Sequence, residues 1–132
     1  MLCNMNTISR ITVIDDDRDL RNLLQISLGI HGYEVNSFGN AEEFLAQESQ
    51  LNPSDLYIID INLGGMTGDA LCHHLKSNCR KDACLVFLIS ANPEMPQLAS
   101  TCAADGFIFK PFSQKELVSK IQLLPSGKSK VK

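Results

Sequence analysis

Residues 56–68 read Leu-Tyr-Ile-Ile-Asp-Ile-Asn-Leu-Gly-Gly-Met-Thr-Gly, and this stretch decides the fold. A short apolar run bounded by turn residues is typical of a strand buried on both faces. The run ends at Asp60, and a glycine-rich loop follows over residues 62–68. An ionised carboxylate at the end of a buried strand is costly unless a charged group meets it. The stretch therefore predicts a buried strand that delivers Asp60 to a functional site.

Three other apolar runs are each followed at once by polar or charged residues. The residues after the runs at 11–14, 85–89 and 107–109 are, in turn, Asp15 with Asp16, Ser90, and Lys110. Four such strand ends are hard to explain by core packing alone. In an open parallel sheet, ligands bind beyond the carboxyl ends of the strands, so these side chains are candidates for one site.

Strand-like runs alternate along the chain with amphipathic segments, which indicates repeated β-α units and a doubly wound, five-stranded parallel sheet in a three-layer αβα sandwich. The predicted strands are residues 10–14, 33–38, 56–59, 84–89 and 106–109. The predicted helices are residues 17–29, 41–48, 68–77, a short helix between 93 and 104, and 113–124. Asn40 with Glu43, and Ser113 with Glu116, have the spacing of helix capping boxes.

Composition predicts one ordinary soluble domain. The chain has 132 residues, 44% of them hydrophobic, and a net charge of -3. We expect a leader at residues 1–8, the domain at 9–124, and a disordered basic tail at 125–132. The mild acidity argues against a direct nucleic-acid ligand, and no apolar run is long enough to cross a membrane.

The five cysteines are odd in number and show no Cys-x-x-Cys spacing, which predicts reduced thiols and a cytoplasmic location. The N-terminus lacks a signal-peptide pattern, which favours the same location. Cys72, His73, His74 and Cys79 suggest a competing metal site. Adjacent histidines on a helix point about 100° apart, so we disfavour this interpretation.

The ordered set of motifs resembles the receiver domain of two-component response regulators. It comprises the acidic run at 15–17, Asp60 at the end of a strand, Ser90-Ala91 and Lys110-Pro111-Phe112. The resemblance covers residues 9–124 and implies the flavodoxin-like strand order 2-1-3-4-5. It also implies a phosphoacceptor signalling domain, which catalyses only its own phosphoryl transfer and autodephosphorylation. The implied phosphodonor is a sensor histidine kinase or a phosphotransfer protein.

By resemblance, Asp60 is the phosphoacceptor, and Asp16, Asp60 and the main-chain carbonyl of Asn62 bind Mg²⁺ directly. Asp15 binds the ion through water, and Mn²⁺ is expected to substitute. Two carboxylates about 4 Å apart repel by roughly 4 kcal/mol at an effective dielectric of 20, which a hard cation relieves. Lys110 and Ser90 are expected to contact the phosphoryl oxygens.

The resemblance also implies a conformational switch. Ser90 and the ring of Phe107 are expected to move together and to alter a surface that binds an unknown downstream protein. The Lys110–Pro111 peptide is expected to be cis. The chain departs from the family pattern at Gly64, a common proline position, and has prolines at 93 and 96 that should delay the helix there.

Two alternatives remain. A haloacid-dehalogenase-like phosphohydrolase would use Asp15 as the nucleophile, although no acidic pair follows Lys110. A degenerate receiver would bind partners without phosphate, which the intact acidic residues disfavour. Taken singly, each site residue also has an ordinary structural explanation, such as a helix cap or a surface lysine. The sequence is compatible with a stand-alone regulator, a relay intermediate and a receiver from a longer protein.

Overall fold

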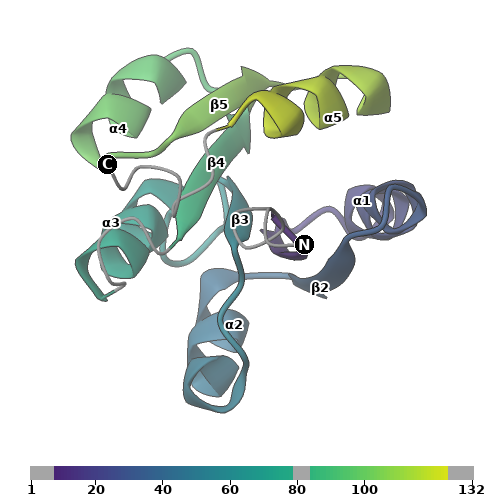
Figure 1. Ribbon diagram of the computed structural model, residues 1–132. Coiled ribbons are helices and arrows are strands. Elements are labelled where there is room, and N and C mark those ends of the chain that lie inside the picture. The colour runs from purple at the N-terminus through teal and green to yellow at the C-terminus, as the bar shows by residue number, and fades with distance from the viewer. Residues whose placement is uncertain (1–7, 79–83, 125–132) are drawn as a thin grey trace, which may run out of the picture.

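The computed structural model describes residues 8–78 and 84–124 as a parallel sheet covered on both faces by helices (Figure 1). The strand order is β2-β1-β3-β4-β5, and every adjacent pair is parallel. The expected doubly wound α/β fold and its 2-1-3-4-5 order are therefore confirmed. The strands are β1 (Arg10–Ile14), β2 (Glu34–Phe38), β3 (Leu56–Asp60), β4 (Leu85–Ser90) and β5 (Gly106–Phe109). The helices are α1 (Arg18–Ile30), α2 (Ala41–Gln47) with the 3-10 turn η2 (Glu48–Gln50), α3 (Gly68–Asn78), α4 (Met95–Thr101) and α5 (Gln114–Leu123).

The sheet separates two apolar layers, because alternate residues of each buried strand point to opposite faces. One layer contains Leu24 of α1 and Leu117 of α5. The other contains Phe44 of α2, Leu71 of α3 and Met95 of α4. The helices of the two layers lie on opposite sides of the sheet in Figure 1. This double coverage leaves the loops after the strands as the place for a site.

Capping boxes were predicted at the starts of α2 and α5, and one of the two is complete. Ser113 and Glu116 form the expected capping box at α5. Asn40 accepts a hydrogen bond from the Glu43 amide at 2.7 Å, as expected. A complete box also needs the Glu43 carboxylate to accept from the Asn40 amide. That part of the prediction is wrong, because the carboxylate accepts instead from the amide of Gly39.

Two strands extend one residue further than the sequence predicts. Asp60 pairs with Ile89, and Ser90 pairs with Phe109, so both polar residues belong to the ladder rather than to the following loops. Pairing with a neighbouring strand sets these ends, and local pattern does not contain that information. Helix α4 starts late, with Pro96 in its first turn, and the Lys110–Pro111 peptide is cis, both as expected.

The cysteines differ in their oxidation state. Cys72 and Cys102 are free, whereas Cys84 is disulfide-bonded, so the prediction of reduced thiols is wrong at Cys84.

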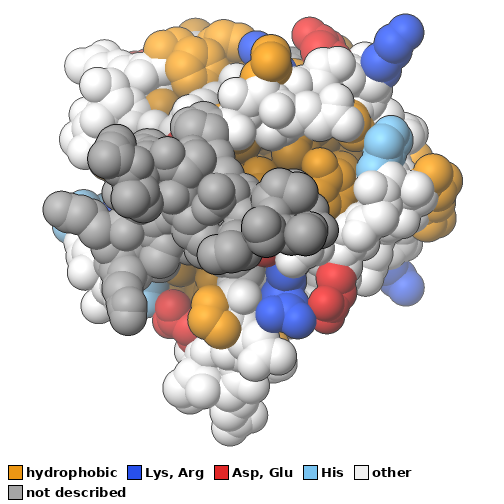
Figure 2. All heavy atoms as spheres, in the orientation of Figure 1, with side chains coloured by type: hydrophobic (Ala, Val, Ile, Leu, Met, Phe, Trp, Pro, Cys, Tyr) orange, Lys and Arg blue, Asp and Glu red, His pale blue; other side chains and the backbone are white. Residues whose placement is uncertain are grey.

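The basic tail at 125–132, and all of the leader except Ile8, lie outside the described residues. Among the described residues, no helix has the length and apolarity to cross a membrane. On the face in Figure 2, the visible acidic and basic side chains are scattered rather than gathered by sign.

Candidate functional site

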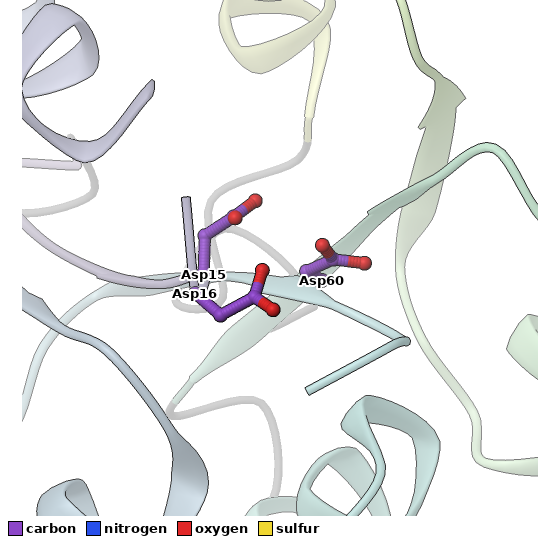
Figure 3. A group of neighbouring side chains, drawn as sticks. All are labelled: Asp15, Asp16 and Asp60. Atoms are coloured by element: carbon purple, nitrogen blue, oxygen red, sulfur yellow. The ribbon is translucent and has the colours of Figure 1, made fainter. Parts of the chain in front are cut away.

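Three carboxylates meet where β1 and β3 end side by side. Ile14 pairs with Ile59, so the residues that follow these two positions are brought to the same edge of the sheet. One ligand oxygen from each of Asp15, Asp16 and Asp60 lies within 4.8 Å of the others. Asp15 and Asp60 are only 0% and 5% exposed, while Asp16 is exposed. Figure 3 shows the three side chains gathered at these strand ends, as the resemblance implied through its strand order.

Lys110 neutralises part of this acidic cluster. Its Nζ lies 2.9 Å from Asp15 Oδ2 and 2.9 Å from Asp60 Oδ2. The backbone amide of Lys110 donates to the carbonyl of Ser90, which extends the sheet and directs the lysine across the end of β4. Partial burial disfavours the ammonium, but the hydrogen bonds and charges of Asp60 and Asp15 outweigh it and raise the pKa of Lys110. The lysine is therefore a fixed positive charge in the site.

The Asp15 carboxylate is the most constrained group in the cluster. Its Oδ1 accepts a hydrogen bond from the Asp17 amide at 2.8 Å. Its Oδ2 is buried and makes no hydrogen bond of good geometry, although the Lys110 ammonium lies close. Burial raises the pKa of Asp15, while the Asp17 amide and Lys110 act in the opposite direction. An under-satisfied buried oxygen beside two more carboxylates fits a hard, oxygen-liganded cation such as Mg²⁺.

The competing metal site receives no support from the described residues. The carboxylate trio is the one group of three or more His, Cys, Asp or Glu side chains there with metal-binding proximity. His74 Nε2 instead pairs with Glu48 Oε1 at 3.0 Å. Cys79 lies outside the described residues.

Asp60 is held on both oxygens. Its Oδ1 accepts from the backbone amide of Asn62 at 3.0 Å, and its Oδ2 accepts from Lys110. The side chain of Asn62 donates to Ser90 Oγ at 3.4 Å, and the amide of Asn92 donates to the same oxygen at 3.0 Å. Ser90 is 1% exposed. Because its oxygen is already an acceptor, its hydroxyl proton remains available to donate.

The loop from β3 to α3 needs glycine at two positions. A Cβ at Gly68 would collide with the carbonyl oxygen of Asp60, because α3 begins in direct contact with the end of β3. The Gly68 amide also donates to the carbonyl of Ile61 at 2.8 Å, which closes the base of the loop. Gly64 has a φ of +90°, a conformation that favours glycine. The glycine-rich sequence thus encodes a specific loop shape.

Sequence reasoning missed two residues that support the site. Arg21 of α1 donates from Nη1 to the main-chain carbonyl of Asp15 at 2.7 Å. Glu42 of α2 accepts from the amide of Met66, in the loop after Asp60, at 2.8 Å. Both act on backbone groups, which carry no residue-specific signal, so no spacing pattern could have identified them.

The ring of Phe107 lies between the apolar core and the protein surface. Its ring is partly buried against the layer that contains Phe44, Leu71 and Met95. It also makes an edge-to-face contact with Phe109, with ring centroids 5.9 Å apart. Phe109 is 42% exposed, so this aromatic pair runs from the core to the surface. A switching role for Phe107 stays a prediction.

Comparisons with known proteins agree on one family. The response regulator receiver domain matches residues 11–122. The transcriptional regulatory protein AruR of Pseudomonas aeruginosa is 35% identical over 125 residues, which are 91% of this chain and 50% of AruR. The DNA-binding response regulator MtrA of Mycobacterium tuberculosis is 31% identical over 115 residues, which are 86% of this chain and 49% of MtrA. The chain therefore spans about half the length of these curated relatives.

Solved structures give the same result. The chemotaxis response regulator CheY4 of Vibrio cholerae superposes with a TM-score of 0.78 at 25% identity, covering 88% of this chain and 98% of that one. The response regulator TrrA of Thermotoga maritima, solved in complex with Mg²⁺-BeF, has a TM-score of 0.76 at 32% identity, covering 87% and 97%.

The fold and the acidic site define a phosphorylation-type signalling domain rather than a conventional enzyme. The chain belongs to the response regulator receiver domain family of two-component systems. Receiver domains interact with histidine kinases. This family membership also rules against a haloacid-dehalogenase-like phosphohydrolase.

Proposed function

We propose that Asp60 accepts a phosphoryl group from the phosphohistidine of a sensor histidine kinase or a phosphotransfer protein. The observation that carries this proposal is the position of Asp60, which lies in the carboxylate cluster and against the Lys110 ammonium. The side chain is orientated by the Asn62 amide on one oxygen and by Lys110 on the other. Such preorganisation favours in-line attack on a phosphorus atom.

Asp15, Asp16, Asp60 and the main-chain carbonyl of Asn62 are the proposed magnesium-binding groups. The under-satisfied Asp15 Oδ2 and the oxygen-only ligand set support this assignment. When bound, the ion supplies positive charge that offsets the carboxylates and the phosphoryl oxygens. Mn²⁺ has similar ligand preferences and is proposed to substitute. The Mg²⁺-BeF complex of the related TrrA supports the same chemistry.

In the proposed transfer, an oxygen of Asp60 attacks phosphorus and forms a new P–O bond. The P–N bond to the donor histidine breaks, and its electron pair leaves with the imidazole, which takes up a proton from solvent as needed. Lys110 stabilises one phosphoryl oxygen by charge, and the hydroxyl of Ser90 donates to another. Autodephosphorylation is the corresponding attack by water on phosphorus, which returns the Asp60 carboxylate and releases inorganic phosphate.

The same contacts are proposed to connect the site to an output surface. Ser90 and Phe107 are proposed to shift together when the phosphoryl group draws the Ser90 hydroxyl inward. Phe107 lies on β5 beside Phe109, whose exposed ring would report the change at the surface. The proposed reader of that surface is a downstream protein. We predict no direct contact of this domain with nucleic acid or membrane.

The decisive experiment is phosphorylation with acetyl phosphate and Mg²⁺, followed by mapping of the modified peptide. Wild type is expected to carry the label on Asp60, and Asp60→Asn is expected to lose it while keeping its far-UV circular dichroism spectrum. Asp19→Asn is the matched control, because Asp19 is an exposed carboxylate in the first turn of α1. Full labelling of the Asp60→Asn variant, or a label on Asp15 in wild type, refutes the proposal.

A further inference from the structure

The loop between β3 and α3 carries the Asn62 amide, one of the two groups that orientate Asp60. It leaves the sheet through Ile61, passes Asn62 and the buried Leu63, and turns at Gly64 and Gly65. Two glycines in succession give the turn little stiffness of its own. The position of the turn therefore depends on contacts with neighbouring elements.

A carboxylate from α2 supplies such a contact. Glu42 Oε2 accepts from the Met66 amide at 2.8 Å, across 24 residues of sequence. A Cβ built on Gly65 would lie 2.6 Å from the same oxygen and 3.1 Å from Glu42 Cδ. The carboxyl group thus lies against the Gly65 backbone while it holds the next amide. The hydrogen bond from Met66 also lowers the pKa of Glu42.

We propose that Glu42 is a positioning residue, which sets the loop so that Asn62 is correctly placed against Asp60 and the magnesium site. This inference rests on the proposed function of Asp60. It also explains Gly65, since any side chain there would displace the Glu42 carboxylate. A carboxylate is a flexible group, so the cost of Gly65→Ala is the lost hydrogen bond more than a rigid clash.

The test is a double-mutant cycle with Glu42→Ala and Gly65→Ala. Each single variant is expected to speed hydrogen exchange at the Met66 amide by roughly three- to tenfold, the factor given by a typical net hydrogen-bond free energy. Each is also expected to weaken Mg²⁺ binding, measured by calorimetry without a phosphodonor. The double variant is expected to resemble either single variant, because both changes remove the same contact. Glu42→Gln, which keeps an acceptor oxygen, is expected to restore part of both effects.

Glu43→Ala is the matched control, because Glu43 is the next residue of the same helical turn and accepts from Gly39 rather than from the loop. It should leave Met66 exchange and Mg²⁺ affinity at wild-type values. Additive effects in the cycle, or unchanged Mg²⁺ affinity in Glu42→Ala, overturn the inference. If wild type takes no label on Asp60, the phosphoacceptor proposal is refuted instead. The two outcomes are distinguishable because the exchange and Mg²⁺ measurements need no phosphorylation.

Discussion

Replacing Lys110 by methionine should destabilise the metal-free domain by about 3 kcal/mol. The ammonium lies 2.9 Å from an oxygen of each of Asp15 and Asp60, and these two carboxylates remain within about 4.8 Å of each other after its removal. At that separation and an effective dielectric of 20, their repulsion is about 3.5 kcal/mol. Breaking a buried ion pair costs about 3–5 kcal/mol, and the side chain of Lys110 is 25% exposed, which favours the lower end.

Saturating Mg²⁺ should reduce this loss to about 1 kcal/mol, because the cation takes over neutralisation of the carboxylates. By thermodynamic linkage, a difference of about 2 kcal/mol corresponds to roughly thirtyfold tighter Mg²⁺ binding by the Lys110→Met variant. The assay is urea unfolding in EDTA and in Mg²⁺, followed by circular dichroism because the chain has no tryptophan. Titration calorimetry measures the Mg²⁺ affinity independently.

Lys115→Met is the control for loss of a lysine, because Lys115 is exposed in α5. Its stability should change by no more than about 0.5 kcal/mol in either buffer. Equal destabilisation of Lys110→Met with and without Mg²⁺, together with unchanged Mg²⁺ affinity, would show that Lys110 and the cation do not act on the same charges.

Two further predictions concern the loop after Asp60. Gly68→Ala should destabilise the fold by about 3 kcal/mol in urea unfolding, since its Cβ meets backbone atoms that cannot move aside. Gly29→Ala is its control and should leave the free energy of unfolding unchanged or raise it, because a Cβ there meets nothing within 4 Å. Equal losses of stability in both variants would contradict the packing argument. The lowered pKa of Glu42 means that its ionised form stabilises the fold above the ordinary pKa of 4.5, and that this contribution is lost as pH falls through the lower folded value. The stability advantage of wild type over Glu42→Gln should therefore be constant at neutral pH and shrink below pH 4.5, and an advantage independent of pH would be evidence against the charged hydrogen bond.

Local sequence signals predicted most of the architecture because they arise from short-range physics. Apolar runs set the places of four strands, whereas β2 is a mixed polar and apolar segment, and the bounds of β1 and β5 agree with the prediction. The capping box at Ser113 works as expected, because both partners lie within one helical turn. The box at Asn40 is half wrong because the Glu43 carboxylate has a second amide, that of Gly39, within reach.

In the candidate site, too, the sequence predicted some features and the tertiary structure decided others. The sequence alone showed which polar side chains follow apolar runs, namely Asp15, Asp16, Asp60, Ser90 and Lys110. Pairing between strands then decided that Asp60 and Ser90 are the last residues of their strands. Strand order was known only by resemblance, and the proximity of the three carboxylates depends on it.

Only the tertiary structure decided how these groups are partnered. It placed one lysine between two carboxylates, left Asp15 Oδ2 without a hydrogen bond, and brought Glu42 to the Met66 amide. The lysine and Glu42 contacts each join segments far apart in the chain. The positions of the Lys110 and Asp15 side chains depend on several packed elements that together set distances of a few ångströms. The Glu42 contact ends on a backbone amide, which every residue except proline possesses.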